Sequence, residues 1–142
     1  MSNSSLIIHL INARSICNKI DYLNIHIDHY KPDVLAITET WGRAPLTDSL
    51  VTPSGFNLFR KDREVRAGGG VMLLGRSVYN PIPFEIPDTI FFNDSVWCTI
   101  PFSPAKSILV GYVYRSPSSD SSNDKSLFTL FDFVSSLVMT IV

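Results

Sequence analysis

Charged residues and cysteines are scarce in this chain of 142 residues, and long hydrophobic runs are missing. Only 18% of the residues are charged and the net charge is −1, so the chain as a whole offers no electrostatic reason to bind nucleic acid. Cys17 and Cys98 lie far apart without metal-ligand spacing, which favours free thiols in a reducing compartment. The N-terminus lacks the basic region of a signal peptide, and no apolar stretch reaches the roughly 20 residues of a membrane helix. We therefore expect a soluble, intracellular protein.

Hydrophobic residues make up 45% of the chain, enough for one buried core. Residues 6–11 are apolar on both faces apart from His9, which is typical of a strand covered on two sides. Apolar residues then recur at spacings of three and four from 16 to 30, which predicts an amphipathic helix that Pro32 ends. Residues 34–39 form the next apolar run. Because the connection is too long for a hairpin, we expect two parallel strands.

The remainder of the chain predicts antiparallel strands and one further helix. Gly68 to Gly70 read as a turn between two strands; no lysine and hydroxyl follow them, which excludes a P-loop. A polar loop is expected at 116–126, and helical spacing resumes from Leu127 to Val138. This order suggests a mixed sheet with helices on one outer face, in a single α/β domain over residues 1–142. The expected strands cover residues 56–60, 71–74, 82–86, 96–100 and 108–114.

Two polar residues follow the first two strands at the point where each strand ends. Asn12 follows one strand and Glu39 follows the other. The carboxyl ends of parallel strands meet at one edge of an open sheet, where α/β proteins build their sites. A carboxylate and an amide suit Mg²⁺, which keeps most of its waters and needs only one or two carboxylates. Taken alone, however, both residues are better explained as loop caps, because carboxylates at strand ends are common.

Four longer strings give these residues a context: LINARSICNKID, KPDVLAITETW, FRKDREVRAGGGVMLL and VGYVYRSPSS. With them, the chain resembles the endonuclease domain of non-LTR retrotransposons, within the exonuclease–endonuclease–phosphatase family that includes the abasic-site endonucleases. The resemblance runs in the family's order and spacing over residues 5–138. It implies the N-terminal half of a two-sheet α/β sandwich, a mixed sheet with flanking helices, and one active site across the carboxyl edges.

The resemblance also implies an activity, which is hydrolysis of a DNA phosphodiester by an activated water with Mg²⁺, or Mn²⁺, as cofactor. Glu39 would be the acidic metal ligand, Asn12 would orient the phosphate or a metal-bound water, and Tyr114 would lie near the scissile phosphate. The basic cluster between 60 and 66 could follow a DNA backbone. The residues expected to contact DNA are Arg14, Arg60, Lys61, Arg63 and Arg115, and Arg66 completes the basic cluster.

Simpler explanations exist for some of these residues. Without the resemblance, Tyr114 would be an aromatic residue that packs on the sheet. The basic cluster could equally be a solvated hairpin rim, because Asp62 and Glu64 are interspersed in it.

The second half of the family's site has no counterpart in the sequence. An Asp-x-Asn strand end and a Ser-Asp-His are missing; Asp28-His29 and Asp132-Phe133 fall within expected helices and do not replace them. We therefore expect a fragment without useful turnover, with an apolar sheet face that another chain or domain would cover. The functional parent protein would act on DNA in the nucleus. The alternatives are a non-catalytic nucleic-acid-binding or inert remnant, and a phosphatase or phospholipase relative.

Overall fold

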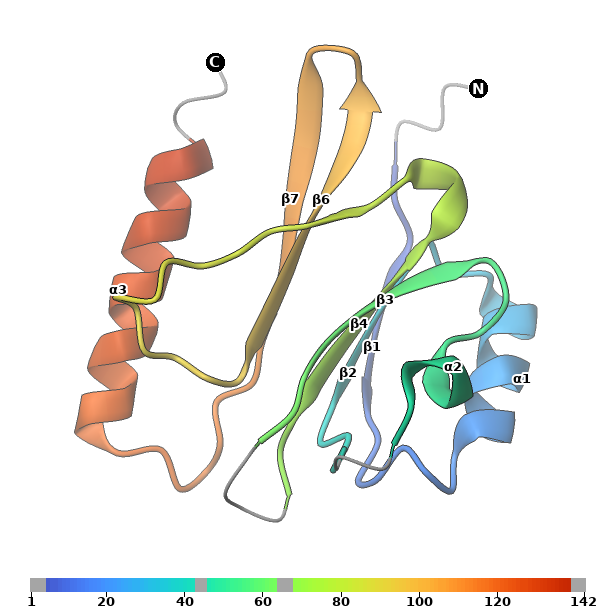
Figure 1. The fold of residues 1–142 in the computed structure, drawn as a ribbon, viewed down its shortest axis with the longest axis horizontal. Helices are drawn as coiled ribbons and strands as arrows, with labels where there is room; N and C mark the ends of the chain where they lie inside the picture. The colour runs from blue at the N-terminus through green and yellow to red at the C-terminus, as the bar shows by residue number, and fades with distance from the viewer. Residues whose placement is uncertain (1–4, 43–45, 64–67, 139–142) are drawn as a thin grey trace.

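Two β-sheets pack face to face, with helices on the outside (Figure 1). The computed structural model describes residues 5–42, 46–63 and 68–138. One sheet has the strand order β1-β2-β4-β3 and the other β5-β6-β7. The elements are β1 (Ile8–Asn12), α1 (Ile20–Tyr30), β2 (Val34–Thr38), α2 (Asp48–Val51), β3 (Phe56–Lys61), β4 (Val71–Arg76), the 3-10 turn η1 (Ser77–Tyr79), β5 (Ile82–Pro83), β6 (Ser95–Ser103), β7 (Lys106–Val113) and α3 (Ser121–Val138).

The first sheet is mixed, as expected. Strands β1 and β2 run parallel, from Ile8 opposite Val34 to Asn12 opposite Thr38. Strand β4 is antiparallel to both β2 and β3. Every residue of β2 is buried, because β2 lies inside the sheet and both of its faces are covered. The β3–β4 hairpin is confirmed, although residues 64–67 at its tip lie outside the described residues.

Two hydrophobic cores lie on opposite sides of the first sheet. On the outer side, Leu35 and Ile37 pack with Leu23 and Ile27 of α1. On the inner side, the opposite face of the sheet meets residues of β6 and β7 in a second buried cluster. That cluster contains Val34, Ala36, Val71, Leu73, Val96, Cys98, Ile100 and Val110.

Helices cover both outer faces of the sandwich, whereas the order of elements had suggested one mixed sheet with helices on one outer face. Strand β6 is the reason, because it is apolar on both sides: Val96 and Cys98 point to the first sheet, while Trp97 packs with Leu127 and Leu130 of α3. A strand with two apolar faces needs a layer on each. The late strands therefore form a second layer with its own helix, in agreement with the two-sheet architecture that the resemblance implied.

Several element boundaries differ from the expected ones. Helix α3 begins at Ser121, inside the expected loop, because the carboxylate of Asp120 accepts a hydrogen bond of 2.8 Å from the backbone N–H of Asn123 and so caps the helix. Strand β6 runs through Pro101, with an irregular register between Pro101 and Ser103. Helix α1 begins at Ile20, four residues later than its apolar spacing suggested. Only two residues of the expected strand 82–86 are paired.

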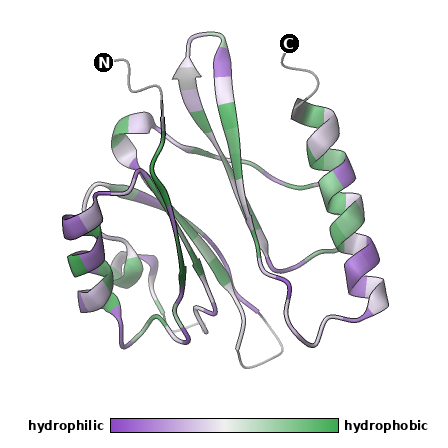
Figure 2. Cartoon of the chain, turned by 180° about the vertical axis from the view of Figure 1, so that it is seen from behind, coloured by the Kyte–Doolittle hydropathy of each residue, from purple (hydrophilic) through white to green (hydrophobic). Residues whose placement is uncertain are grey.

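Exposed apolar side chains mark strand β1, which is an edge strand of the first sheet as far as the described residues show. Ile8 is 53% exposed and Leu10 is 65% exposed, and Figure 2 shows hydrophobic colour along this strand. Both side chains lie on the face that elsewhere packs on the second sheet. The chain or domain expected to cover this surface stays a prediction.

The cysteines are free, as the sequence predicted: Cys17 is exposed and Cys98 is buried. Among the helices in the described part of the chain, none is both long and apolar enough to cross a membrane.

Candidate functional site

Asn12 and Glu39 end up at the same edge of the first sheet. Asn12 lies opposite Thr38 in the parallel register. The backbone N–H of Ser15 donates a hydrogen bond of 2.8 Å to the carbonyl of Glu39, which ties the two loops together directly after the strands. Asn12 is exposed and Glu39 is half-buried. The strand–helix–strand pattern therefore delivers an amide and a carboxylate to one rim, as its topology predicted.

The backbone after β2 is held in an uncommon conformation. Glu39 has φ 49° and Trp41 has φ 52°, the left-handed region that residues other than glycine seldom adopt. The backbone N–H groups of Thr40 and Trp41 donate to the carbonyls of Gly70 and Gly69 at 3.5 and 3.0 Å. Such strain persists where the surroundings impose it, and it concentrates at functional sites. The glycine segment thus supports the Glu39 loop.

Tyr114 joins Glu39 from the second sheet. Its hydroxyl donates a hydrogen bond of 2.5 Å to Oε1 of Glu39, and its ring packs against the core between the sheets. The hydrogen bond to Glu39 raises the pKa of Tyr114, and burial and the charge of Glu39 raise it further. Tyr114 therefore does both things that the sequence left open: it packs on the sheet, and it reaches the carboxylate.

An ion pair borders this contact. Arg63 donates to Asp94 through Nε at 3.0 Å and through a terminal nitrogen at 2.6 Å. Asp94 also accepts the backbone N–H of Tyr114 at 2.9 Å. The pKa of Arg63 is raised mainly by the hydrogen bond to Asp94, with a small contribution from Glu39. The pair links the β3–β4 hairpin to the start of β6, so it holds the two sheets together beside Glu39.

The other residues expected to contact DNA differ in whether they already form ion pairs with carboxylates of the chain. Arg60 pairs with Asp48 at 3.1 Å and with Asp62 at 2.7 Å. Arg115 forms two contacts of 2.9 Å with Asp124. A paired guanidinium must share or release its carboxylate before it can bind a phosphate.

Lys61 and Arg14 are different, because both are exposed and neither forms an ion pair with a carboxylate of the described residues. Arg14 lies in the loop after β1, on the same rim as Asn12. Arg66 lies outside the described residues.

The rim contains few ligands for a metal ion. In residues 5–42, 46–63 and 68–138, no group of three or more His, Cys, Asp or Glu side chains could hold one. Glu39 and Asn12 still fit Mg²⁺, since both offer hard oxygen ligands and this cation binds largely through water. Oε1 of Glu39 accepts from Tyr114, and no hydrogen bond within the described residues engages Oε2 or the Asn12 amide. These residues would hold the ion at the rim.

The structure adds two residues that the sequence did not single out. Asp94, directly before β6, holds both Arg63 and the backbone of Tyr114. Lys19 donates to the carbonyls of Ala13, Arg14 and Ser15, and so fixes the loop after Asn12. No local pattern could reveal Asp94, whose partners lie far from it in the sequence.

The two Asp-containing dipeptides that were not accepted as replacements for the missing motifs lie in helices, as expected. Asp28-His29 lies in α1 and Asp132-Phe133 in α3. Neither pair lies at the ends of β1 and β2 with Asn12 and Glu39.

Similarity to known proteins is found at the level of structure. No protein-family model matches the sequence, and no curated protein matches it. The AP endonuclease LMAP from Leishmania major aligns with a TM-score of 0.66 at 15% identity, over 83% of this chain and 45% of that chain. The 3' phosphatase NExo from Neisseria, bound to a product DNA hairpin, gives a TM-score of 0.67 at 14% identity, over 95% and 53%. TDP2 from D. rerio, complexed with a single-strand DNA product, gives 0.56 at 14%, over 92% and 54%.

These matches define what is shared. The chain spans about half the length of the structures that it matches. The TM-scores of 0.56 to 0.67 at identities of 14–15% show a shared fold. The chain therefore has the two-sheet α/β fold of the exonuclease–endonuclease–phosphatase proteins, to which these nucleases and phosphatases belong.

Proposed function

We propose that this chain is part of a Mg²⁺-dependent DNA endonuclease of the type that non-LTR retrotransposons encode. It would contribute Asn12, Glu39 and Tyr114 to the active site. In the parent protein it would nick target DNA in the nucleus to prime reverse transcription. The observation that carries the proposal is the hydrogen bond from Tyr114 to Glu39, which brings both sheets together at the rim where Asn12 also ends.

Each residue has a chemical role in this proposal. Glu39, with Asn12, would hold the cation, which neutralises charge on the phosphate when bound. The Asn12 amide can donate a hydrogen bond to a phosphate oxygen. The Tyr114 hydroxyl has one proton, which it donates to Glu39, so Tyr114 would position the Glu39 carboxylate for the cation. Asn12 would thus orient the phosphodiester, and Tyr114 would act through Glu39.

We further propose that this chain alone has no useful turnover. Among the described residues, Glu39 is the carboxylate that follows the ends of β1 and β2, and the three histidines lie in β1 and α1, away from the strand ends. A positioned general acid or base contributes about a hundredfold to ten-thousandfold, and no described residue at the rim supplies it.

The test compares the wild-type chain with Glu39→Gln. We expect Mn²⁺, used as a paramagnetic substitute for Mg²⁺, to broaden the NMR signals of Asn12 and Tyr114 in the wild-type chain and not in Glu39→Gln. Supercoiled plasmid with Mg²⁺ should stay intact with both proteins. Unchanged broadening in Glu39→Gln would overturn the metal assignment, and nicking that this substitution abolishes would overturn the proposed inactivity.

A second candidate is a non-catalytic nucleic-acid-binding module, which the single carboxylate favours. It predicts salt-sensitive DNA binding that Mg²⁺ and Glu39→Gln leave unchanged. Hydrolysis of an inositol phosphate or a sphingolipid would instead identify a phosphatase or phospholipase relative.

A further inference from the structure

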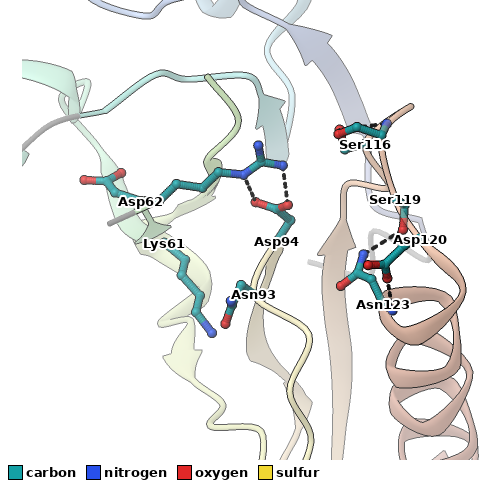
Figure 3. A pocket seen from close by; sticks show the side chains of 10 residues that line it. Lys61, Asp62, Asn93, Asp94, Ser116, Ser119, Asp120 and Asn123 are labelled. Atoms are coloured by element: carbon teal, nitrogen blue, oxygen red, sulfur yellow. Dashed lines mark hydrogen bonds and ion pairs between the residues drawn. The ribbon is translucent and has the colours of Figure 1, made fainter. Parts of the chain in front are cut away.

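A polar cavity of about 450 Å³ adjoins the Arg63–Asp94 ion pair. It lies between the end of the β3–β4 hairpin and the loop that leads into α3. Figure 3 shows Lys61 and Asn93 on one side of the opening and Asn123 on the other. Because Tyr114 bonds to the backbone of Asp94, the cavity begins directly beside the proposed site.

The charges around the cavity leave one cation available. Asp94 is neutralised by Arg63, and Asp62, which also lines the cavity, is neutralised by Arg60. The ammonium of Lys61 has no carboxylate partner within the described residues. An unpaired ammonium beside neutralised carboxylates is suited to one anionic group.

The opposite wall supplies one carboxylate together with neutral polar groups. Asp120 is the acidic residue of this wall, and it already accepts the backbone N–H of Asn123 at 2.8 Å. The remaining groups there are serine hydroxyls and the Asn123 amide. An anion is therefore expected on the Lys61 side, and a group that forms hydrogen bonds is expected on the α3 side.

The type of ligand follows from what the lining lacks. None of the described residues that line the cavity is aromatic or aliphatic, so the cavity has no surface on which a base could stack. Proteins that hold single bases rely on such stacking. A sugar–phosphate backbone needs the opposite lining, with one cation for the phosphate and polar groups for the sugar and phosphate oxygens.

We propose that this cavity binds the sugar–phosphate backbone of the DNA strand beside the scissile phosphate, with Lys61 contacting one phosphate. The inference rests on the proposed function and adds a subsite to it. It also assigns different roles to two basic residues of the hairpin. Lys61 contacts DNA, whereas Arg63 remains a structural link to Asp94.

The first experiment measures duplex DNA binding by fluorescence anisotropy over a range of NaCl concentrations. Loss of one phosphate contact lowers the slope of log K against log [salt] by about 0.9 for duplex DNA. We expect this decrease for Lys61→Gln, and rescue by Lys61→Arg. The matched control is Lys106→Gln, which replaces the exposed first residue of β7. It follows the β6–β7 turn, which lies at the opposite end of the sandwich from the tip of the β3–β4 hairpin (Figure 1), and its slope should equal that of the wild-type chain.

The outcomes separate the inference from the function on which it rests. A slope that is equal in Lys61→Gln and Lys106→Gln would overturn the subsite and leave the proposed function intact. If the wild-type chain itself shows no salt-dependent binding, the proposed function is overturned, and the subsite with it.

The second experiment asks whether the ligand is backbone or base. A trinucleotide of abasic residues should shift the side-chain amide NMR signals of Asn93 and Asn123, and Lys61→Gln should weaken the shift. Thymidine, which carries a base and no phosphate, should leave both signals in place. Equal shifts with thymidine would overturn the inference, because the cavity would then bind a nucleoside that has no phosphate.

Discussion

The hydroxyl of Tyr114 donates a hydrogen bond of 2.5 Å to Glu39, a residue 75 positions away in the sequence. The contact joins the end of β7 to the end of β2, so it forms only when the two sheets are correctly packed at the rim.

The first test is Tyr114→Phe, which removes only the hydroxyl. We expect the free energy of unfolding to fall by about 1.5 kcal/mol, the lower end for hydrogen bonds to charged groups, in urea titrations. Tyr22→Phe is the control, because Tyr22 is 59% exposed on α1; equal losses in both variants would contradict the assignment.

Arg63 and Asp94 should be energetically coupled. Because the two side chains share two hydrogen bonds, the double variant Arg63→Gln/Asp94→Asn should lose less stability than the two single variants together. We expect a coupling energy of about 1–2 kcal/mol, within the range for residues of one ion-pair network. A double-mutant cycle by urea unfolding measures it. Additive losses would show that the pair does not link the sheets.

Gly70 should be intolerant of alanine because of a contact rather than its backbone angle. A Cβ at Gly70 would lie 2.5 Å from Oγ1 of buried Thr40, whereas a Cβ at Gly55 would meet nothing within 4 Å. The two glycines have nearly the same φ, 83° and 82°, so Gly55→Ala is a matched control for backbone strain. We expect Gly70→Ala to lower the melting temperature more than Gly55→Ala does. The same decrease in both variants would show that strain alone decides.

Stability should fall on acidification because of His26. The pKa of His26 is lowered by burial, then by His9, whose ring nitrogen lies 3.0 Å from its own, and least by His29. Below about pH 6.5 the unfolded chain therefore binds more protons than the folded chain, so stability that is complete above this pH is lost as pH falls. Urea midpoints at about pH 7.5 and 5.5 should differ less in His26→Gln than in the wild-type chain. His29→Gln, which removes only the smallest cause, should keep most of the difference.

The two thiols should react very differently. Burial raises the pKa of Cys98 to about 11, and Cys17 is exposed. Since the thiolate is the reactive form, a thiol reagent such as DTNB should titrate Cys17 alone in the folded chain and both cysteines in denaturant. Cys17→Ser should leave the folded chain unreactive. Fast reaction of that variant would show that the core around Cys98 opens readily.

Local patterns were sufficient for the first part of the fold. Hydrophobic spacing located β1, α1 and β2, and the length of the connection required parallel pairing. Parallel pairing in turn placed Asn12 and Glu39 at one edge, because carboxyl ends of parallel strands coincide. The onset of α3 was missed, since a single capping contact from Asp120 outweighed the polar composition of the segment.

The sequence by itself determined which residues stand at the strand ends, because that depends on local periodicity and chain direction. Tertiary packing alone decided that β6 and β7 form a second layer, since the burial of both faces of β6 depends on partners distant in sequence. The same packing brought Tyr114 to Glu39 and Arg63 to Asp94, and it formed the cavity beside Lys61. Contacts between residues so far apart cannot be read from a local pattern, because they exist only when both sheets are assembled.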